Sequence, residues 1–353
     1  MLKRFEDALN ACTYCPNLCL HSCVVSNAEK KSSVTPWGKM SLLQWVKEGI
    51  APLNEETTEI LYKCTGCGAC TASCVHEIPV ATVLMEGRQE ALKRGLGGPR
   101  KQERSISQTR LDSVRVRGGR GSLKGKVVYW PGCQKGLDDE ETRVATQAVL
   151  KALTGREVVL GPSACCGAVE VSNGRPEAAR NEALGLGAIL GEAEMVFAGS
   201  GLCQHHLLSN RVHVESLIPF VLKSLLAEPE RLNGLHPGPV AIFESCSHLR
   251  KLKISDQVVA LASRLVDGGV QELRWCGNKS QCCGAGGGYA QSSPEGARQG
   301  GRRILEMAAD TGAEILTSFD SECVAHLKEC TWDGGPTVIS GMALLANLMN
   351  LQD

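Results

Sequence analysis

Two Cys-Cys-Gly triplets are the residues of this chain whose type and spacing say most about its chemistry. They begin at Cys165 and Cys282, and each has one cysteine well upstream and one well downstream. The two full sets are Cys133, Cys165, Cys166 and Cys203, and then Cys246, Cys282, Cys283 and Cys323. Corresponding cysteines lie 113 to 120 residues apart, which indicates a duplicated unit.

Adjacent cysteines favour a multinuclear cluster over a single metal ion. Neighbouring side chains diverge, so they are poorly placed for one tetrahedral metal but can bind two irons of one cluster. The chain has 18 cysteines, and residues 1–10 read as a short polar helix rather than as a signal peptide. We therefore expect free thiolates in a reducing cytoplasm, and iron–sulfur clusters bound to them, rather than disulfides.

Eight further cysteines form two runs near the N-terminus. The run from Cys64 to Cys74 has the C-x2-C-x2-C-x3-C spacing of a bacterial ferredoxin loop, and the run from Cys12 to Cys23 is one residue longer. In such loops three thiolates bind one [4Fe–4S] cluster and the fourth commonly binds the other. The expected ligands are Cys12, Cys15, Cys19 and Cys74 for one cluster, and Cys64, Cys67, Cys70 and Cys23 for the other. Val24 and Val75 follow the two runs where ferredoxins usually have proline.

A zinc ribbon is the alternative interpretation of these two runs. The C-x2-C pairs Cys12/Cys15 and Cys64/Cys67 would then share one zinc ion. Four cysteines of the two runs would be left without a role, so we prefer the cluster interpretation.

The surrounding sequence predicts three folded parts and a linker. Residues 1–98 read as helical and form the two-cluster part, while residues 99–122 are basic and glycine-rich and read as an exposed linker. Residues 123–235 and 236–353 each alternate strands and helices. The predicted fold is an α-helical two-cluster ferredoxin domain followed by two pseudo-symmetric α/β modules, called CCG modules here after their triplets.

The predicted strands place the module cysteines. Strands are expected at 126–130, 157–160, 194–198, 240–243, 270–275 and 314–317, and helices at 40–48, 57–62, 138–153, 176–190, 256–266 and 295–309. Loops at the carboxyl ends of strands are where open α/β sheets place their sites. We therefore expect the cysteines of each module to lie in such loops.

These residues resemble a known family over nearly the whole chain. The chain is similar to heterodisulfide reductase catalytic subunits, to iron–sulfur subunits of glycolate oxidase and to the C subunit of anaerobic glycerol-3-phosphate dehydrogenase. The stretches that carry the resemblance are Thr35-Pro-Trp-Gly-Lys-Met40, Tyr129-Trp-Pro-Gly-Cys133, Ala164-Cys-Cys-Gly-Ala168, Glu244-Ser-Cys-Ser-His-Leu249 and Cys282-Cys-Gly-Ala-Gly-Gly-Gly288. The resemblance implies one or two further [4Fe–4S] clusters, cubane or noncubane, in the CCG modules.

One departure from the family pattern bears on activity. In heterodisulfide reductases a noncubane cluster held by five cysteines cleaves a disulfide, and the family motif ends in C-x2-C. Here Ser200 and Asp320 stand where the first of those two cysteines would be. Each module then offers four thiolates, one short of the noncubane set. Cys276 and Cys330 are left over; Cys276 could be a substitute ligand, but free buried thiols are the favoured interpretation of both.

The leading hypothesis is an electron-transfer subunit of a multisubunit oxidoreductase. By resemblance, its partner is a flavoprotein dehydrogenase, an electron-transfer flavoprotein or a membrane quinone-reducing subunit, and membrane association would come only through that partner. The alternative is a catalytic subunit that reduces a disulfide at a CCG module. A third interpretation is a zinc scaffold. The sequence singles out no catalytic residue for any of them.

Other features give weaker signals. The 38 basic and 38 acidic residues balance, which gives no argument for nucleic acid. The stretch from Gly284 to Gly288 has neither a Walker lysine nor G-x-G-x-x-G spacing, so we expect its glycines to let backbone approach a cluster. His206 and His326 each follow a module's last cysteine by three residues, and a hydrogen-bonding role is favoured over proton donation.

Overall fold

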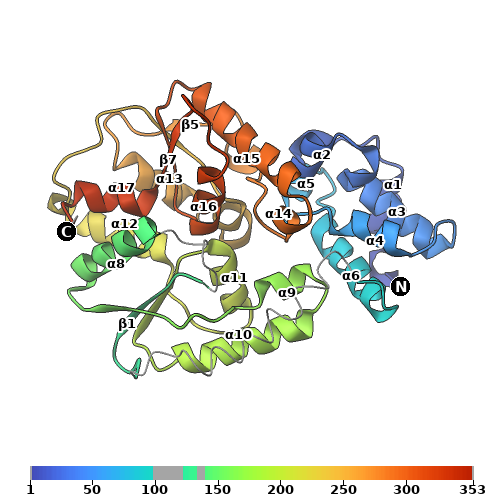
Figure 1. Cartoon of the computed structure of the whole chain (residues 1–353), viewed down its shortest axis with the longest axis horizontal. Helices are drawn as coiled ribbons and strands as arrows, with labels where there is room; N and C mark the ends of the chain where they lie inside the picture. Colours follow the sequence, from blue (N-terminus) through green and yellow to red (C-terminus); the bar gives the residue numbers. More distant parts are fainter. Residues whose placement is uncertain (1, 98–121, 133–139, 352–353) are drawn as a thin grey trace.

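The computed structural model describes residues 2–97, 122–132 and 140–351 of the 353-residue chain. The predicted linker and Cys133 therefore lie outside the described residues, apart from Ser122 at the linker's end. The described part combines a helical N-terminal region with two parallel sheets that helices surround (Figure 1).

The N-terminal region is built from short helices around a small apolar core. They are η1 (Lys3–Phe5), α1 (Glu6–Thr13), η2 (Leu20–Ser22), α2 (Val24–Glu29), η3 (Ser32–Val34), α3 (Pro36–Glu48), α4 (Glu55–Tyr62), α5 (Ala69–Ala72) and α6 (Val80–Lys93). The Thr35 side chain caps α3 by accepting from the Gly38 N–H, and Asn54 and Thr57 form a capping box on α4. Leu9, Leu43 and Leu84 are fully buried between these helices. The core holds the two cysteine runs in place.

The first sheet has three parallel strands in the order β2-β1-β3. The strands are β1 (Val127–Trp130), β2 (Val158–Leu160) and β3 (Met195–Ala198), with helices α8 (Glu140–Thr154), α9 (Ala168–Ser172), α10 (Pro176–Leu190), α11 (Gly201–Ser209) and α12 (Leu217–Ala227) around them. The short helix η4 (Pro229–Arg231) leads to the second sheet.

The second sheet has four parallel strands in the order β5-β4-β6-β7. The strands are β4 (Val240–Ile242), β5 (Gln271–Glu272), β6 (Ile315–Ser318) and β7 (Thr337–Ser340). Their helices are the π-helix η5 (Ser247–Leu252), α13 (Ser255–Ser263), η6 (Gly277–Lys279), α14 (Tyr289–Ser292), α15 (Pro294–Ala309), α16 (Ser321–Lys328) and α17 (Gly341–Leu348).

The two sheets share one hydrophobic core. Helix α8 packs on α17 and α12 packs on α13, so helices of the two modules meet directly. Buried side chains of both sheets belong to one apolar cluster, among them Val127 of β1 and Val240 of β4. This packing fixes the relative position of the two modules. Burial of apolar surface between them stabilises the arrangement by about 25 cal/mol for each Å² removed from water.

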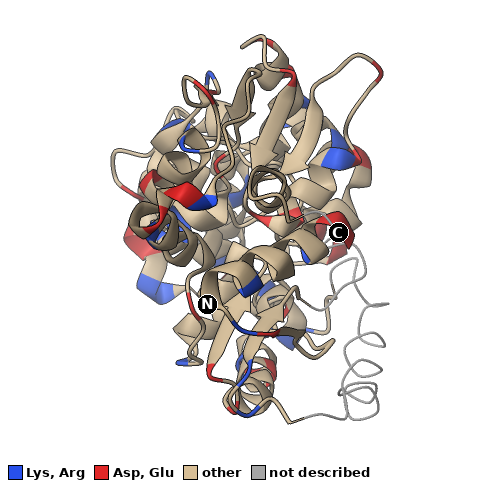
Figure 2. Cartoon of the chain, turned by 90° about the vertical axis from the view of Figure 1, so that its left-hand side faces the viewer, with Lys and Arg blue, Asp and Glu red and all other residues tan. Residues whose placement is uncertain are grey.

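The surface carries mixed charge. Figure 2 shows acidic and basic residues interspersed over the side of the molecule that it presents. None of the helices in the described ranges is long and apolar enough to cross a membrane.

Candidate metal centres and the cavity beside them

The first N-terminal run meets the last cysteine of the second run. Burial, reinforced by the neighbouring Cys19, Cys15 and Cys74, raises the pKa of the Cys12 thiol to about 12. Burial also raises the pKa of Cys19 to about 11, again with Cys74 among its neighbours. Four thiols thus lie together although Cys74 is far along the chain. As thiolates they would repel one another, so a bound cation is needed to keep them ionised.

A second group brings Cys23 to the second run. Burial raises the pKa of Cys70 well above its usual value, and Cys67, Cys23 and Cys64 reinforce the shift. The Gly66 N–H donates to the Cys64 sulfur at 3.4 Å. Cys19 of the first group also acts on Cys70, so the two groups are neighbours. Their donor sets fit iron–sulfur clusters, and because Cys23 also acts on Cys19, the division into two crossed ligand sets stays a prediction.

The grouping does not favour a zinc ribbon. Cys12 and Cys15 fall in one group, whereas Cys64 and Cys67 fall in the other.

Three buried or half-buried cations surround the loop from Cys64 to Cys67. Lys39 is 1% exposed and donates to the Lys63 carbonyl oxygen. Arg88, also 1% exposed, donates to the carbonyl oxygens of Leu61 (2.7 and 3.0 Å), Cys64 (3.3 Å) and Ser172 (2.6 Å). Arg250 donates to the Cys67 carbonyl oxygen at 2.9 Å. A cluster held by four thiolates is anionic, so these cations stabilise it where it would sit.

Sequence reasoning missed these cations. Lys39 lies in a stretch that carried the family resemblance, but its contact with the carbonyl before Cys64 depends on how α3 packs on α4. Arg88 and Arg250 carry no local signal, since their carbonyl partners are distant in sequence.

The second CCG module brings all four of its predicted cysteines to one cavity. Cys246 follows β4, Cys282 and Cys283 follow β5, and Cys323 lies in α16 after β6. The sulfur atoms of Cys283 and Cys323 are 3.3 Å apart, and Cys282 contacts both Cys246 and Cys283. The Gly284 N–H donates to the Cys282 sulfur at 3.4 Å. The predicted loop placement is confirmed for Cys282 and Cys283, whereas Cys246 caps η5 and Cys323 lies inside α16.

The second N-terminal group contacts the second module directly. Contact with Cys282, together with the Arg250 guanidinium, holds the pKa of Cys67 well below its usual value. Around this contact the Gln281 side chain donates to the His21 carbonyl at 3.0 Å. Gly287 passes so close to the Cys64–Thr65 backbone that an added Cβ would lie 2.5 Å from the Thr65 carbonyl carbon. The glycine loop therefore serves close approach to a cysteine loop.

Val24 explains one departure from the ferredoxin pattern. It is 3% exposed and packs in an apolar cluster with Cys67, Cys282 and Tyr289, between the N-terminal region and the second module. Val24 thus packs in the interface between the N-terminal region and the second module. A ferredoxin without such a module has no interface of this kind. Val75, by contrast, is 90% exposed.

The first CCG module brings together the three cysteines that the structure describes. Cys166 contacts both Cys165 and Cys203. The N–H groups of Gly167 and Ala168 donate to the sulfurs of Cys165 and Cys166, each at 3.4 Å. The fourth predicted ligand, Cys133, follows β1 and lies outside the described residues.

The same local contacts recur in both modules. His206 shares a hydrogen bond with the Ala179 carbonyl at 3.2 Å, and His326 shares one with the Ala297 carbonyl at 3.1 Å. Gly167 and Gly284 have positive φ values of 88° and 104°, and a Cβ at either would meet those same carbonyl oxygens at 2.5 and 2.8 Å. Both histidines form hydrogen bonds, as favoured, but to the neighbouring helices α10 and α15 and not within their own helices.

Asp320 links the two modules. Its carboxylate is 1% exposed and accepts from the Gly201 N–H at 3.3 Å, from the Ser245 hydroxyl at 3.1 Å and from the Glu322 N–H at 3.2 Å. Its counterpart Ser200 is also buried, and its hydroxyl has no partner within the described part. The position that carries a cysteine in the family pattern is here occupied by an inter-module hydrogen-bond acceptor.

Asp320 offers a clean mutational test. Asp320→Ala leaves two buried donors and one half-buried donor unpaired, so we expect the free energy of unfolding to fall by about 2–4 kcal/mol. The iron content of the folded fraction should not change, because the Asp320 carboxylate is engaged by these hydrogen bonds and does not serve as an iron ligand. Ser200→Ala is the matched control, with an expected change under about 1 kcal/mol. Loss of iron without loss of stability in Asp320→Ala would instead identify a ligand.

The two leftover cysteines lie apart from the groups. Cys276 is half-buried and its sulfur donates to the Glu272 carboxylate at 3.5 Å, so its interpretation as a substitute ligand receives no support. The expectation of a buried thiol is wrong for Cys276, because the loop after β5 leaves it partly open to solvent. Cys330 is 3% exposed and lies 3.7 Å from the His326 ring nitrogen, as a buried free thiol.

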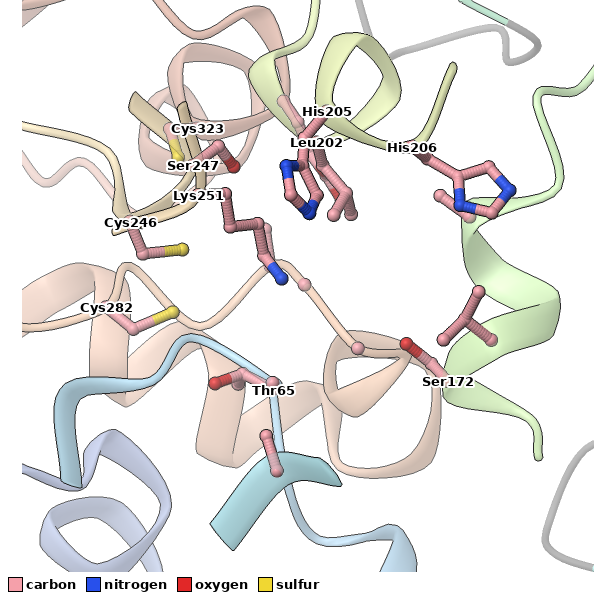
Figure 3. A pocket seen from close by; sticks show the side chains of 18 of the residues that line it. Thr65, Ser172, Leu202, His205, His206, Cys246, Ser247, Lys251, Cys282 and Cys323 are labelled. Carbon is pink, nitrogen blue, oxygen red and sulfur yellow. The ribbon is translucent and has the colours of Figure 1, made fainter. Parts of the chain in front are cut away.

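The cavity at the second module is lined by all three folded parts. Its volume is about 320 Å³, and its walls come from Thr65 and Met85 of the N-terminal region, from α9 and α11, and from the four cysteines. In Figure 3 the thiols of Cys246, Cys282 and Cys323 lie at one end. The Lys251 ammonium and the His205 ring point into the space between those thiols and Ser172. Burial raises the pKa of Glu322, which also lines the cavity, to about 8, and the Asp320 carboxylate reinforces the shift.

Comparisons with known proteins agree with this organisation. Residues 8–78 match the 4Fe-4S dicluster domain family, and residues 127–208 and 240–328 each match the cysteine-rich domain family, CCG. The D subunit of dihydromethanophenazine:CoB–CoM heterodisulfide reductase from Methanosarcina barkeri is 23% identical over 302 residues, 78% of this chain and 74% of the relative. The B subunit of fumarate reductase (CoM/CoB) from Methanothermobacter marburgensis is 24% identical over 300 residues, 77% of this chain. The chain spans 57% of that relative, less than two thirds of its length.

A solved structure shares the fold. The crystal structure of a hypothetical protein from Helicobacter pylori superposes with a TM-score of 0.60 and 10% identity, over 100% of this chain and 76% of that one. The matched domains, in the order that the structure has them, establish the family. The chain belongs to the iron–sulfur proteins that join a 4Fe-4S dicluster domain to cysteine-rich CCG domains, the family that includes the D subunit of heterodisulfide reductase.

Proposed function

We propose that this chain is an iron–sulfur electron-transfer subunit of a multisubunit oxidoreductase. The observation that carries the proposal is the contact between Cys67 and Cys282, which joins the second N-terminal group to the second CCG module. Because Cys19 and Cys70 bring the two N-terminal groups together, three cysteine groups form a continuous series. Clusters bound in them would supply single-electron transfer. The chain's own part is to hold neighbouring sites at fixed spacing and to shield them from water.

The ligands that we propose are the four sets that the sequence predicts. Cys12, Cys15, Cys19 and Cys74 would hold one [4Fe–4S] cluster, Cys64, Cys67, Cys70 and Cys23 the second, Cys246, Cys282, Cys283 and Cys323 a third, and Cys133, Cys165, Cys166 and Cys203 a fourth. The buried thiols and the N–H groups directed at sulfur support these sets. We also propose that residues 1–98, 123–235 and 236–353 are the domains and that the two CCG modules are pseudo-symmetric copies.

Anaerobic purification with iron and sulfide analysis tests the proposal. We expect a brown protein whose reduced form gives the electron paramagnetic resonance signals of [4Fe–4S] clusters. A colourless protein that contains zinc and no iron would refute it.

Three exposed apolar residues, called the apolar rim here, adjoin cysteines of the first group in sequence and support docking of a flavoprotein partner there. Tyr14, Leu18 and Val75 are 86%, 65% and 90% exposed, and they flank Cys12, Cys15 and Cys74 in sequence. Exposed apolar residues grouped at one place mark interaction sites. Electrons would then pass between the partner and the series at this end.

Val75→Glu tests the docking site. A carboxylate in an apolar interface must be desolvated, so we expect about a tenfold or greater loss of affinity for the co-purifying flavoprotein, measured by calorimetry. Iron content should not change. Ile50→Glu is the control, because Ile50 is 71% exposed and follows the far end of α3, where Lys47 pairs with Glu6. Equal affinity of Val75→Glu and Ile50→Glu for the flavoprotein would show that the partner does not dock at the apolar rim.

The cavity at the second module favours one other function. A catalytic subunit needs space for a reactant beside the cluster, and the four cysteines of this module line such a space. Oxidation of the reduced protein with a thiol present would then generate a new paramagnetic signal. Cubane signals alone, with no thiol-dependent species, would exclude disulfide reduction here.

A further inference from the structure

Glu182 places a carboxyl group beside the cysteines of the first CCG module. It lies on α10, and burial, reinforced by the neighbouring Cys165 and Glu170, raises the pKa of its carboxyl to about 7. One of its two carboxylate oxygens, Oε2, is buried and accepts no hydrogen bond within the described part of the chain. A buried carboxylate oxygen without a donor is costly, so this side chain needs a partner.

The charged residues next to Glu182 do not supply that partner. Glu170 is 4% exposed, and its own carboxylate accepts from the Arg175 guanidinium and from the Asn173 amide at 3.5 Å. The Arg175 charge lowers the pKa of Glu182, but its Nε donates to Glu170. Arg175 therefore pairs with Glu170, while the buried oxygen of Glu182 still lacks a donor among the described residues.

The second module has no carboxylate at the corresponding place. Ala179 and Ala297 correspond, because each shares a hydrogen bond with its module's histidine, and three residues further on stand Glu182 and Gly300. A Cβ at Gly300 would lie 2.5 Å from the Cγ2 atom of Val24, so the N-terminal region fills this place in the second module. The carboxyl group therefore distinguishes the first module from the second.

Iron is the cation that the surroundings of Glu182 offer. Cys166 contacts both Cys165 and Cys203, and all three thiols are proposed cluster ligands. Iron in proteins also binds carboxylate oxygen, as in sites that combine imidazole and carboxylate ligands. A bond to iron would offset the cost of burying the Glu182 carboxylate, as it would for the buried thiols, and the carboxyl proton would pass to solvent.

We propose that the Glu182 carboxylate binds an iron of the cluster in the first CCG module, as an oxygen ligand beside the thiolates of that module. The inference rests on the proposed function, because it needs a cluster at Cys165, Cys166 and Cys203. It makes the two modules chemically different, since the second has glycine at the corresponding position. The competing arrangement is a protonated Glu182 that donates a hydrogen bond to the Cys165 sulfur.

Glu182→Gln separates these two arrangements. Its amide keeps an N–H donor for the Cys165 sulfur but carries no charge to bind iron. In the full-length, cluster-loaded protein labelled with ¹³C at the glutamate side-chain carboxyl, we expect electron–nuclear double resonance to show a strong ¹³C coupling that Glu182→Gln loses. The reduction potential of this cluster should rise in Glu182→Gln, because an anionic ligand favours the oxidised cluster. Glu177→Gln is the matched control, since Glu177 is exposed on the same helix.

The wild-type coupling decides even if Glu182→Gln does not fold. A wild type without a strong ¹³C coupling, or a coupling and potential that are the same in Glu182→Gln and in Glu177→Gln, overturns the proposal. An unchanged potential in Glu182→Gln together with only weak coupling in the wild type identifies the hydrogen-bonded arrangement instead. Equal iron content in the wild type and in Cys165→Ser would refute the proposed cluster in this module, which separates that failure from failure of the ligand alone.

Discussion

Replacing Cys282 by serine is expected to remove the iron of the second CCG module and to break the cysteine series. Cys282 contacts Cys246, Cys283 and Cys67, so it lies where the second N-terminal group meets the module. The N-terminal clusters should remain, because their cysteines belong to other groups. We expect turnover of the assembled oxidoreductase to fall by about a hundredfold or more, measured with the physiological donor and acceptor.

Two other cysteines of the same module provide controls. Cys276→Ser and Cys330→Ser change thiols that lie against Glu272 and His326, outside the groups. Both variants should keep their iron and more than half of the turnover. The account fails if Cys282→Ser keeps a full complement of iron while Cys276→Ser loses it.

Replacing Arg88 by methionine has the second largest expected effect. The variant leaves the carbonyls of Leu61 and Ser172 without their buried donor, so the free energy of unfolding should fall by about 3 kcal/mol, measured by denaturant titration of the cluster-loaded protein. The positive charge that Arg88→Met removes also lies beside Cys64, a proposed ligand of the second N-terminal cluster. An interaction of about 1–2 kcal/mol corresponds to about 40–90 mV for one electron, so the reduction potential of the cluster at this loop should drop by that amount.

Arg94→Met, near the end of the same helix, is the control. Arg94 is exposed and pairs with Glu90, a contact worth at most about 1 kcal/mol. Neither stability nor potential should change appreciably in this variant. Equal potentials in Arg88→Met and in the wild type would show that the buried guanidinium has no electrostatic role.

Much of the fold follows from local sequence signals. The helix predicted at 176–190 coincides with α10, and the strands predicted at 126–130 and 194–198 differ from β1 and β3 by one residue at their starts. The predicted strand at 270–275 shrinks to Gln271–Glu272, because only two of its residues pair with β4. Strand β7 was not predicted, since its four residues carry no alternation and depend on pairing with β6.

The sequence predicts the cysteine ligand sets but not their surroundings. Spacing alone predicts that Cys74 joins the first run and that Cys23 joins the second, because ferredoxin loops exchange their last cysteines. The contact of Cys67 with Cys282 joins residues far apart in the chain, so no local pattern encodes it. The same is true of Asp320, whose role depends on the approach of Gly201 and Ser245 from two modules.

Electron paramagnetic resonance of the fully reduced, anaerobically purified protein tests the central claim most directly. Three neighbouring cysteine groups, with Cys67 in contact with Cys282, predict clusters close enough for their spins to interact, which broadens and splits their signals. In Cys282→Ser the spectrum should lose this interaction and keep the signals of the N-terminal pair and of the first CCG module. Sharp signals from isolated clusters, unchanged in Cys282→Ser, would contradict the continuous series from the N-terminal groups to the second CCG module.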